Sequence, residues 1–255
     1  MQLEFIWKEY KPMYKFAYRH PVIFEVILFI AALILTVLFM LPVQAVTYAS
    51  SEISSSLGRL AASLVLFLVF IRSFRPGRLF TGLSVMLPSL LFALWNVFNC
   101  FATGGGNVTA PDPGLFLTAL APAVFEEIIF REIFIHNLEK AGHSPRSVLF
   151  LSAAVFALVH LTNAVGGSLL QTLVQAGYAF VVGLAFGAVY IVSGDLFAVI
   201  LAHLAVDFSN HIFPGGSVTP LPVIIAFLVL LAGQAAWAFF LIRGKEAGEK
   251  EEIPS

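Results

Sequence analysis

Long apolar runs separated by short polar connections dominate the chain. Eight of these runs are long enough, at about 17 to 25 residues, to cross a bilayer as helices. They cover residues 23–45, 57–74, 79–103, 114–138, 146–165, 169–193, 195–213 and 220–242. Only Ser193-Gly194-Asp195 joins the sixth and seventh runs, so a re-entrant turn is the alternative at that boundary. The pattern predicts an all-α protein, a polytopic transmembrane helical bundle of about eight helices.

The composition supports a membrane protein and argues against one that binds nucleic acid. The chain has 255 residues, of which 59% are hydrophobic and 11% are charged, whereas soluble domains carry about 25% charged residues. The net charge is −1, and the chain offers no basic face or arm beyond its short N-terminal segment to neutralise phosphates. We therefore expect membrane lipids as partners and no nucleic acid.

The charge pattern divides the chain into three segments. Residues 1–22 mix aromatic side chains with Lys and Arg, which is typical of a segment in the headgroup region on the cytoplasmic side. Residues 23–243 form the transmembrane domain, and residues 244–255 form a charged cytoplasmic tail that we expect to be solvated and mobile. Lys and Arg fall in alternate connections only, so both termini are predicted to be cytoplasmic. We expect a multi-pass protein of a prokaryotic plasma membrane.

The stretch from Pro122 to Arg131 places two adjacent carboxylates and a guanidinium inside an apolar run. Ionisable groups at bilayer depth cost several kcal/mol unless they face partners or water, so this stretch is a candidate functional site. Glu127 and Arg131 are four residues apart on one helix face and are predicted to form a supporting pair. Glu126 is rotated by about 100° and gains no local partner. Pro122 removes an amide donor, which predicts a local kink or opening that admits water beside Glu126.

Two later runs carry polar pairs with the same four-residue spacing. Phe156 and His160 share a face of the fifth run, and His203 and Asp207 share a face of the seventh. A rise of about 1.5 Å per residue brings Glu126, His160 and His203 close to the middle of the bilayer. Three separate helices are therefore predicted to bring polar groups into one layer.

These residue types are suited to hydrolysis. A carboxylate and an imidazole can hold and deprotonate a water molecule, and a second imidazole with a polar neighbour can stabilise an oxyanion. Glu126, His160 and His203 also match a catalytic zinc pattern of two His and one Glu, with water as the fourth ligand. The sequence leaves both possibilities open, a Zn²⁺ cofactor and a metal-free glutamate mechanism.

Taken together, the motifs resemble those of a known family. Three motifs follow in order on successive apolar segments: Glu126-Glu127-x-x-x-Arg131, Phe156-x-x-x-His160 and His203-x-x-x-Asp207. This order is similar to the signature of the CAAX protease and bacteriocin-processing (CPBP) family, also called the Abi family. Its members are intramembrane proteases related to the Ras-converting CAAX endopeptidases, which have a similar eight-helix core.

The resemblance implies a role for each matched residue in an intramembrane endopeptidase. It implies that Glu126 and His160 activate the water and that His203 and Asp207 form the oxyanion pair. By the same resemblance, structural support is expected from Glu127, Arg131 and Phe156. The chain departs from the eukaryotic pattern at Asp207, where those enzymes carry Asn. Because an ionised carboxylate repels an oxyanion, we expect Asp207 to orient and charge His203, which is then the donor.

Two other classes of function are compatible with buried ionisable groups. An ion- or proton-coupled transporter is one alternative, and a catalytically silent membrane scaffold or immunity protein is another. A transporter is expected to carry broken helices in two similar halves, whereas the polar residues here cluster in the fourth, fifth and seventh runs. That asymmetry favours the protease, with a peptide or a lipidated protein as its substrate. The sequence carries no prediction of the oligomeric state.

Overall fold

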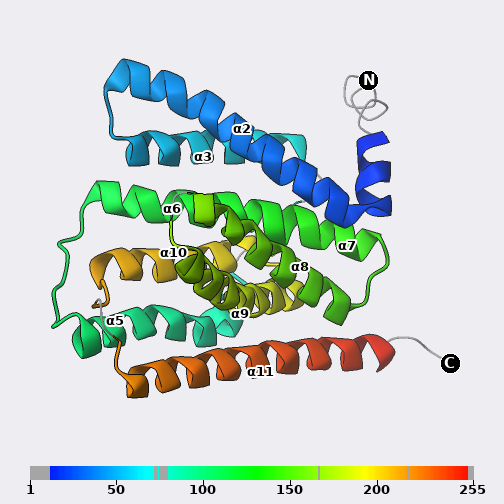
Figure 1. The fold of residues 1–255 in the computed structure, drawn as a ribbon. Helices are drawn as coiled ribbons and strands as arrows, with labels where there is room; N and C mark the ends of the chain where they lie inside the picture. The colour runs from blue at the N-terminus through cyan, green and yellow to red at the C-terminus, as the bar shows by residue number, and fades with distance from the viewer. Residues whose placement is uncertain (1–11, 72–73, 75–79, 166, 217–218, 252–255) are drawn as a thin grey trace.

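The structure is a computed structural model, and within the residues it describes all regular structure is helical (Figure 1). These residues are 12–71, 74, 80–165, 167–216 and 219–251. The first eleven residues of the predicted interfacial segment and the last four of the predicted tail lie outside the described residues. The all-α helical bundle predicted from the sequence is confirmed.

Most of the long helices coincide with the apolar runs of the sequence. Residues 12–19 are helical and precede α2. The elements that follow, in chain order, are α2 (Pro21–Thr47), α3 (Ser51–Val69), α4 (Leu83–Met86), η1 (Leu87–Leu90), α5 (Leu91–Thr103), α6 (Pro113–Glu127), η2 (Ile128–Ile135), α7 (His136–Lys140), α8 (Pro145–Val159), η3 (His160–Val165), α9 (Leu169–Ser193), α10 (Leu196–Ile212) and α11 (Leu221–Glu251).

The predicted spans correspond to these helices with one difference in length. Among the described residues, seven helical stretches are long and apolar enough to cross a membrane. The remaining predicted span, 195–213, corresponds to α10, an apolar helix of 17 residues. At about 1.5 Å per residue, α10 is about 25 Å long and falls slightly short of the bilayer core.

α3 begins six residues earlier than the predicted run, which started at residue 57. The helix begins at Ser51, inside the stretch predicted to be a loop before residue 57. Ser50 caps the helix, because its hydroxyl accepts a hydrogen bond of 3.3 Å from the amide of Ile53. Ser54 and Ser56 are buried in the bundle. The serines that look like a loop in the sequence therefore form the first turns of a helix with a polar buried face.

The predicted span 79–103 is interrupted near its start. A 3₁₀ turn, η1, separates α4 from α5 and contains Pro88. Proline lacks the amide that would continue the α-helical hydrogen bonds. Its carbonyl accepts a hydrogen bond of 2.9 Å from Nε2 of Gln234 on α11, which ties the interruption to a neighbouring helix.

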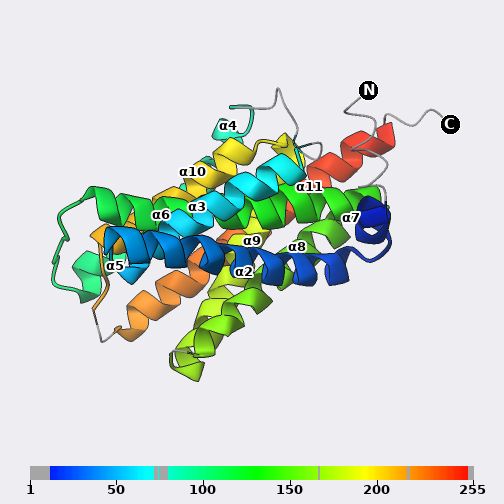
Figure 2. The same ribbon diagram turned by 90° about the horizontal axis from the view of Figure 1, so that it is seen from above.

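Successive helices run in alternating directions along the bundle (Figures 1 and 2). Residues 12–19 and the end of α11 lie at the same end of the bundle. The turn between α9 and α10 joins two complete helices: Gly194 adopts a left-handed conformation (φ 68°), and Asp195 caps α10 through the amide of Ala198 at 3.1 Å. The cytoplasmic location of the termini stays a prediction.

The predicted tail is helical over much of its length. α11 continues past Arg243 to Glu251 without interruption. Lys245 Nζ donates a hydrogen bond of 2.8 Å to the carbonyl of Ile191, and Glu246 forms an ion pair of 2.8 Å with Arg146. These contacts hold the start of the tail against α8 and α9.

The central helix of the bundle is α9. In Figure 1, α2 and α3 lie along one edge and α11 along the other, with α6, α9 and α10 between them. α9 packs closely on α8 through glycines: a Cβ atom at Gly183 would lie 3.0 Å from Cα of Ala153, and one at Gly187 would lie 3.1 Å from Cδ1 of Leu149. Gly183 and Gly187 thus allow a close contact between the two helices, and this contact holds α8, which carries Phe156.

Candidate active site

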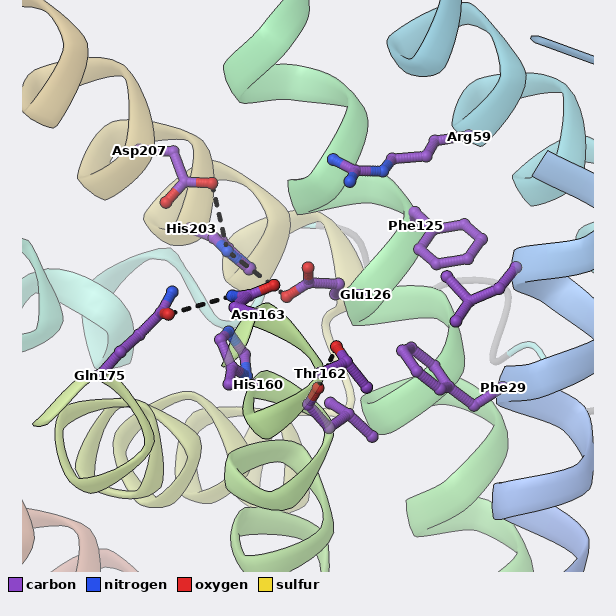
Figure 3. Close-up of a pocket in the computed structure, with 12 residues that line it drawn as sticks. Phe29, Arg59, Phe125, Glu126, His160, Thr162, Asn163, Gln175, His203 and Asp207 are labelled. Atoms are coloured by element: carbon purple, nitrogen blue, oxygen red, sulfur yellow. Dashed lines mark hydrogen bonds and ion pairs between the residues drawn. The ribbon is translucent and has the colours of Figure 1, made fainter. Parts of the chain in front are cut away.

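The residues predicted to be catalytic meet at one cavity (Figure 3). Glu126 comes from α6, His160 from the junction of α8 and η3, and His203 and Asp207 from α10. All four line a cavity of about 290 Å³. The fold therefore brings together three helices that are separate in the sequence.

Behind this cavity lies a fully buried ion pair. Nε of Arg131 is 3.0 Å from Oε2 of Glu127, and neither side chain is exposed. The guanidinium also lies over the ring of Phe156, 4.5 Å from its centroid, which adds a cation–π contact. The pair predicted from the four-residue spacing is formed, and Phe156 packs against it.

Arg131 sits in a widened stretch of its helix. η2, from Ile128 to Ile135, is a π-helix, a rare form that often marks functional sites. Its backbone is tied to α8, because the hydroxyl of Ser152 donates a hydrogen bond of 3.2 Å to the carbonyl of Phe130.

The local kink or opening was predicted beside Pro122, but the α-helix continues past this residue. α6 is α-helical through Pro122 and ends after Glu127, so the irregular turns begin at η2 instead. The loss of one amide donor at Pro122 leaves the hydrogen bonds of the neighbouring turns in place, which explains why the α-helix continues.

His203 connects the buried pair with the cavity. Its Nδ1 lies 2.8 Å from Oε1 of Glu127, and a carboxylate held by Arg131 accepts the hydrogen bond, so Nδ1 carries a proton. Nε2 of the same ring is 3.5 Å from Oδ2 of Asp207 and 4.0 Å from Oε2 of Glu126. The imidazole thus has one nitrogen fixed by the protein interior and one that faces the cavity.

This arrangement differs from the expected one, in which Asp207 orients His203. The carboxylate at Nδ1 belongs to Glu127, while Asp207 approaches the nitrogen that faces the cavity. The spacing along α10 indicated that Asp207 is within reach of His203, and this is correct. The contact from α6 joins residues 76 positions apart, so no local spacing predicts it.

His160 is also held through one nitrogen only. Its Nδ1 lies 2.7 Å from the carbonyl oxygen of Phe156. A carbonyl only accepts hydrogen bonds, so Nδ1 carries the proton and Nε2 keeps a free lone pair. The ring packs on that of Phe156 with centroids 4.8 Å apart. The Phe-x-x-x-His motif therefore fixes both the tautomer and the orientation of His160.

The described residues do not form a zinc ligand set. Zinc requires three protein ligands at about 2.0 to 2.2 Å from one point, and no group of three His, Cys, Asp or Glu side chains among the described residues is arranged in this way. Glu126, His160 and His203 share the cavity without converging on a common position. The choice between a Zn²⁺ cofactor and a metal-free glutamate mechanism stays a prediction.

The structure adds one charged residue that the sequence analysis did not single out. Arg59 of α3 lines the cavity, together with Phe29 and Leu33 of α2. A signal for Arg59 was present, because it is an arginine within the second apolar run that has no acidic residue three or four positions away. Side chains from the first two long helices thus complete a site whose motifs lie on later ones.

Comparison with known proteins identifies the segment that carries the site. Residues 109–209 match the family model described as Type II CAAX prenyl endopeptidase Rce1-like. No curated protein and no solved structure matches the chain. The matched segment runs from the loop before α6 into α10 and contains all three motifs. This segment of the chain is therefore similar to the Type II CAAX prenyl endopeptidases, as the three motifs predicted.

Proposed function

We propose that this protein is an intramembrane endopeptidase that hydrolyses a peptide bond of a membrane-associated or lipidated substrate with a water activated by Glu126 and His160. The observation that carries the proposal is the cavity itself, where a carboxylate and the Nε2 atoms of two imidazoles meet among apolar helices. Because the matching family model is described as a CAAX prenyl endopeptidase, prenylated C-terminal peptides are the first substrates to test.

Glu126 is the base in this proposal. Its side chain is 22% exposed and faces the cavity, whereas Glu127 is fully buried in its ion pair. The free Nε2 of His160 accepts a hydrogen bond from the water and orients it. Glu126 takes the other proton of the water as the oxygen attacks the carbonyl carbon of the substrate. It then passes this proton to the amide nitrogen as the carbon–nitrogen bond breaks.

His203 stabilises the oxyanion of the tetrahedral intermediate. In its protonated form, Nδ1–H donates to Glu127 and Nε2–H is left for the cavity. Asp207 accepts from Nε2–H until the oxyanion replaces it as the acceptor. Before the oxyanion forms, Asp207 is thus the acceptor for Nε2–H of the charged imidazole.

The charges of the site support this protonation state. In and behind the cavity, the numbers of negative and positive groups are equal if His203 is protonated: Glu126, Glu127 and Asp207 are negative, and Arg59, Arg131 and His203 are positive. A low-dielectric site favours such a balance. When Glu126 takes the proton of the water, its negative charge moves to the oxyanion. The net charge of the cavity therefore stays constant through the first step.

The walls of the cavity suit a substrate held in the membrane. Phe29 and Leu33 bring apolar surface of α2 next to the catalytic groups, and Leu33 is 37% exposed on the outside of the bundle. An apolar anchor lying along α2 would leave the attached peptide beside Glu126. This placement favours lipidated or membrane-anchored peptides over soluble ones.

The direct test uses purified protein in liposomes. The substrates are a farnesylated peptide that ends in cysteine, two aliphatic residues and methionine, and the same peptide without the farnesyl group. Mass spectrometry of the products gives the cleaved bond. We expect the farnesylated peptide to be cleaved by the parent and not by Glu126→Gln. Cleavage of neither peptide by the parent, or equal cleavage by the variant, would contradict the proposal.

A further inference from the structure

Arg59 lines the cavity but takes no part in the reaction steps above. It lies on α3, eight residues after Ser51, which is about 12 Å along the helix from its first residue. Figure 3 shows its guanidinium pointing from α3 toward the side of the cavity where Glu126 and Asp207 lie. A charged side chain at this depth needs an explanation, because it is costly without a partner.

The packing of α3 fixes the position of Arg59. At the preceding residue, Gly58, an added Cβ atom would lie 2.5 Å from the carbonyl oxygen of Thr36 and 3.2 Å from the amide nitrogen of Met40. The backbones of α2 and α3 are therefore in direct contact at this point. Arg59 is rotated by about 100° from that contact, and its side chain reaches the cavity.

Arg59 is the unpaired arginine of this region. Among the described residues, no side chain forms an ion pair or a hydrogen bond with its guanidinium, although Glu126 and Asp207 line the same cavity. By contrast, Arg131 pairs with Glu127 at 3.0 Å. Arg59 is partly buried, so water satisfies its five donors only in part. The cavity thus contains a cationic group that is free to bind an anion.

We propose that Arg59 binds the C-terminal carboxylate of the peptide substrate and so selects peptides cleaved close to their C-terminus; this inference rests on the proposed function. A guanidinium binds a carboxylate through two parallel hydrogen bonds. Glu126 and Asp207 repel a carboxylate, so Arg59 is the lining group that attracts it. The scissile bond then lies between Arg59 and the catalytic groups.

The size and depth of the cavity favour a peptide end over other anions. At about 290 Å³ it is just below the range for small-ligand sites, about 300 to 1,000 Å³. A short C-terminal segment fits such a space better than a chain that passes through it. A lipid phosphate carries similar charge, but headgroups lie outside the hydrocarbon core, and Arg59 lies about 12 Å along α3 from its end.

The test compares the farnesylated peptide as a free acid with its C-terminal amide. The enzymes are the parent, Arg59→Gln, Arg59→Lys and, as a matched control, Arg146→Gln, whose side chain is 60% exposed and paired with Glu246. We expect the parent to show a KM for the acid about ten- to a hundredfold below that for the amide. Arg59→Gln should lose this preference, Arg59→Lys should keep part of it, and Arg146→Gln should keep all of it.

Three results would overturn the inference. The first is equal KM values of the parent for acid and amide. The second is a loss in Arg59→Gln that is the same for both peptides, because a residue that only tunes Glu126 or supports the fold does not distinguish them. The third is an Arg59-dependent rate that follows the content of anionic lipid in the liposomes and not the peptide end, which would assign Arg59 to a headgroup.

A binding measurement separates this inference from the proposed function. Binding of the fluorescently labelled acid and amide peptides to Glu126→Gln, with and without Arg59→Gln, requires no turnover. We expect the tenfold or larger preference for the acid in Kd only where Arg59 is present. If the parent cleaves no peptide but this preference is found, the endopeptidase proposal fails and the carboxylate site stands. If cleavage occurs without the preference, the reverse holds.

Discussion

The two halves of the site differ in burial and in ion pairing. In the closed half, Glu127 and Arg131 are fully buried and pair with each other, and His203 donates to the same carboxylate. In the open half, the side chains of Glu126 and Asp207 are 22% and 31% exposed and face the cavity. The closed half fixes geometry, and the open half keeps atoms free for reactants.

The comparison shows how one sequence motif serves both purposes. Glu126 and Glu127 are neighbours in the chain, but a rotation of about 100° per residue sends them to different halves. The buried Glu127 holds the imidazole of His203 in place, and Glu126 meets the opposite nitrogen of that ring across 4.0 Å. Helical geometry thus places a carboxylate that faces the cavity next to one that is buried in an ion pair.

The largest effect is expected in the open half. Glu126→Gln keeps the volume of the side chain but cannot take a proton from water, so we expect a loss of hydrolysis of about 10² to 10⁴-fold. The rate is measured with the farnesylated peptide in liposomes. Activity within a few-fold of the parent would exclude Glu126 as the base.

The same variant tests whether the open half contributes to the stability of the protein. Because Glu126 forms no ion pair with an arginine among the described residues and faces the cavity, its neutralisation leaves no buried charge without a partner. We expect the thermal unfolding midpoint in detergent to stay within a few degrees of that of the parent. A large drop would place Glu126 in the closed half instead.

The second prediction concerns the closed half. Glu127→Gln or Arg131→Gln leaves a fully buried charge unpaired, which costs about 3 to 5 kcal/mol. The double variant should recover part of that stability, but it should not recover activity, because His203 has still lost its carboxylate. Unfolding in detergent gives the double-mutant cycle, and hydrolysis rates are measured on the same preparations.

Two outcomes would contradict this division. Strictly additive losses of stability would show that Glu127 and Arg131 do not interact in solution. Recovery of full activity by the double variant would show that the contact between Glu127 and His203 has no part in hydrolysis. Either result would require a different account of the closed half.

The third prediction tests the support behind His160. A Cβ atom at Gly183 would lie 3.2 Å from Cβ of Ala153 and 3.3 Å from Cδ1 of Phe156, so Gly183→Ala overpacks the contact between α8 and α9. We expect a loss of about 1 to 3 kcal/mol in stability. We also expect reduced activity, because Phe156 holds His160 through its carbonyl.

Gly177→Ala is the matched control for that change. Gly177 lies on the same helix, and an added Cβ atom there meets nothing within 4 Å. Alanine is favoured over glycine in a helix by about 1 kcal/mol, so this variant should be as stable as the parent or slightly more stable. Equal losses from both substitutions would mean that the close approach at Gly183 is not what matters.

The features that the sequence predicted correctly are those that depend on residues close together in the chain. Apolar runs of bilayer length predicted the helices, and four-residue spacings predicted the pair of Glu127 with Arg131 and the proximity of His203 to Asp207. These contacts lie within single helices. Residues four positions apart lie on one face of a helix, and this holds for Glu127 and Arg131 although Arg131 lies in the π-helix that follows α6.

The features that sequence reasoning missed depend on contacts between helices. Glu127 contacts His203, which is 76 positions later in the chain. Arg59 lines the cavity because Gly58 lets α3 pack closely against α2. The π-helix after Glu127 is likewise tied to Ser152 of a neighbouring helix. Contacts between distant helices leave no repeating spacing in the sequence. A charged residue in an apolar run, such as Arg59, therefore indicates a site but does not show which residues lie next to it.

The smallest effect is expected from removal of metal ions. Nδ1 of His160 and Nδ1 of His203 each donate to a protein oxygen, an arrangement that is also found around metal ligands. However, the described acidic and imidazole groups do not converge on a common point, and the proposed steps use Glu126, His160 and His203 alone.

We therefore expect hydrolysis of the farnesylated peptide to be unchanged, within about twofold, after dialysis against a chelator and metal-free buffer. The rate before and after dialysis, together with the zinc content of the protein by mass spectrometry, gives the answer. A loss of activity that is restored by Zn²⁺, with about one zinc bound per chain, would mean that the open half binds a metal and closes around it. In that case Glu126 would be a metal ligand, and the metal would supply the activation of water that is assigned to Glu126 above.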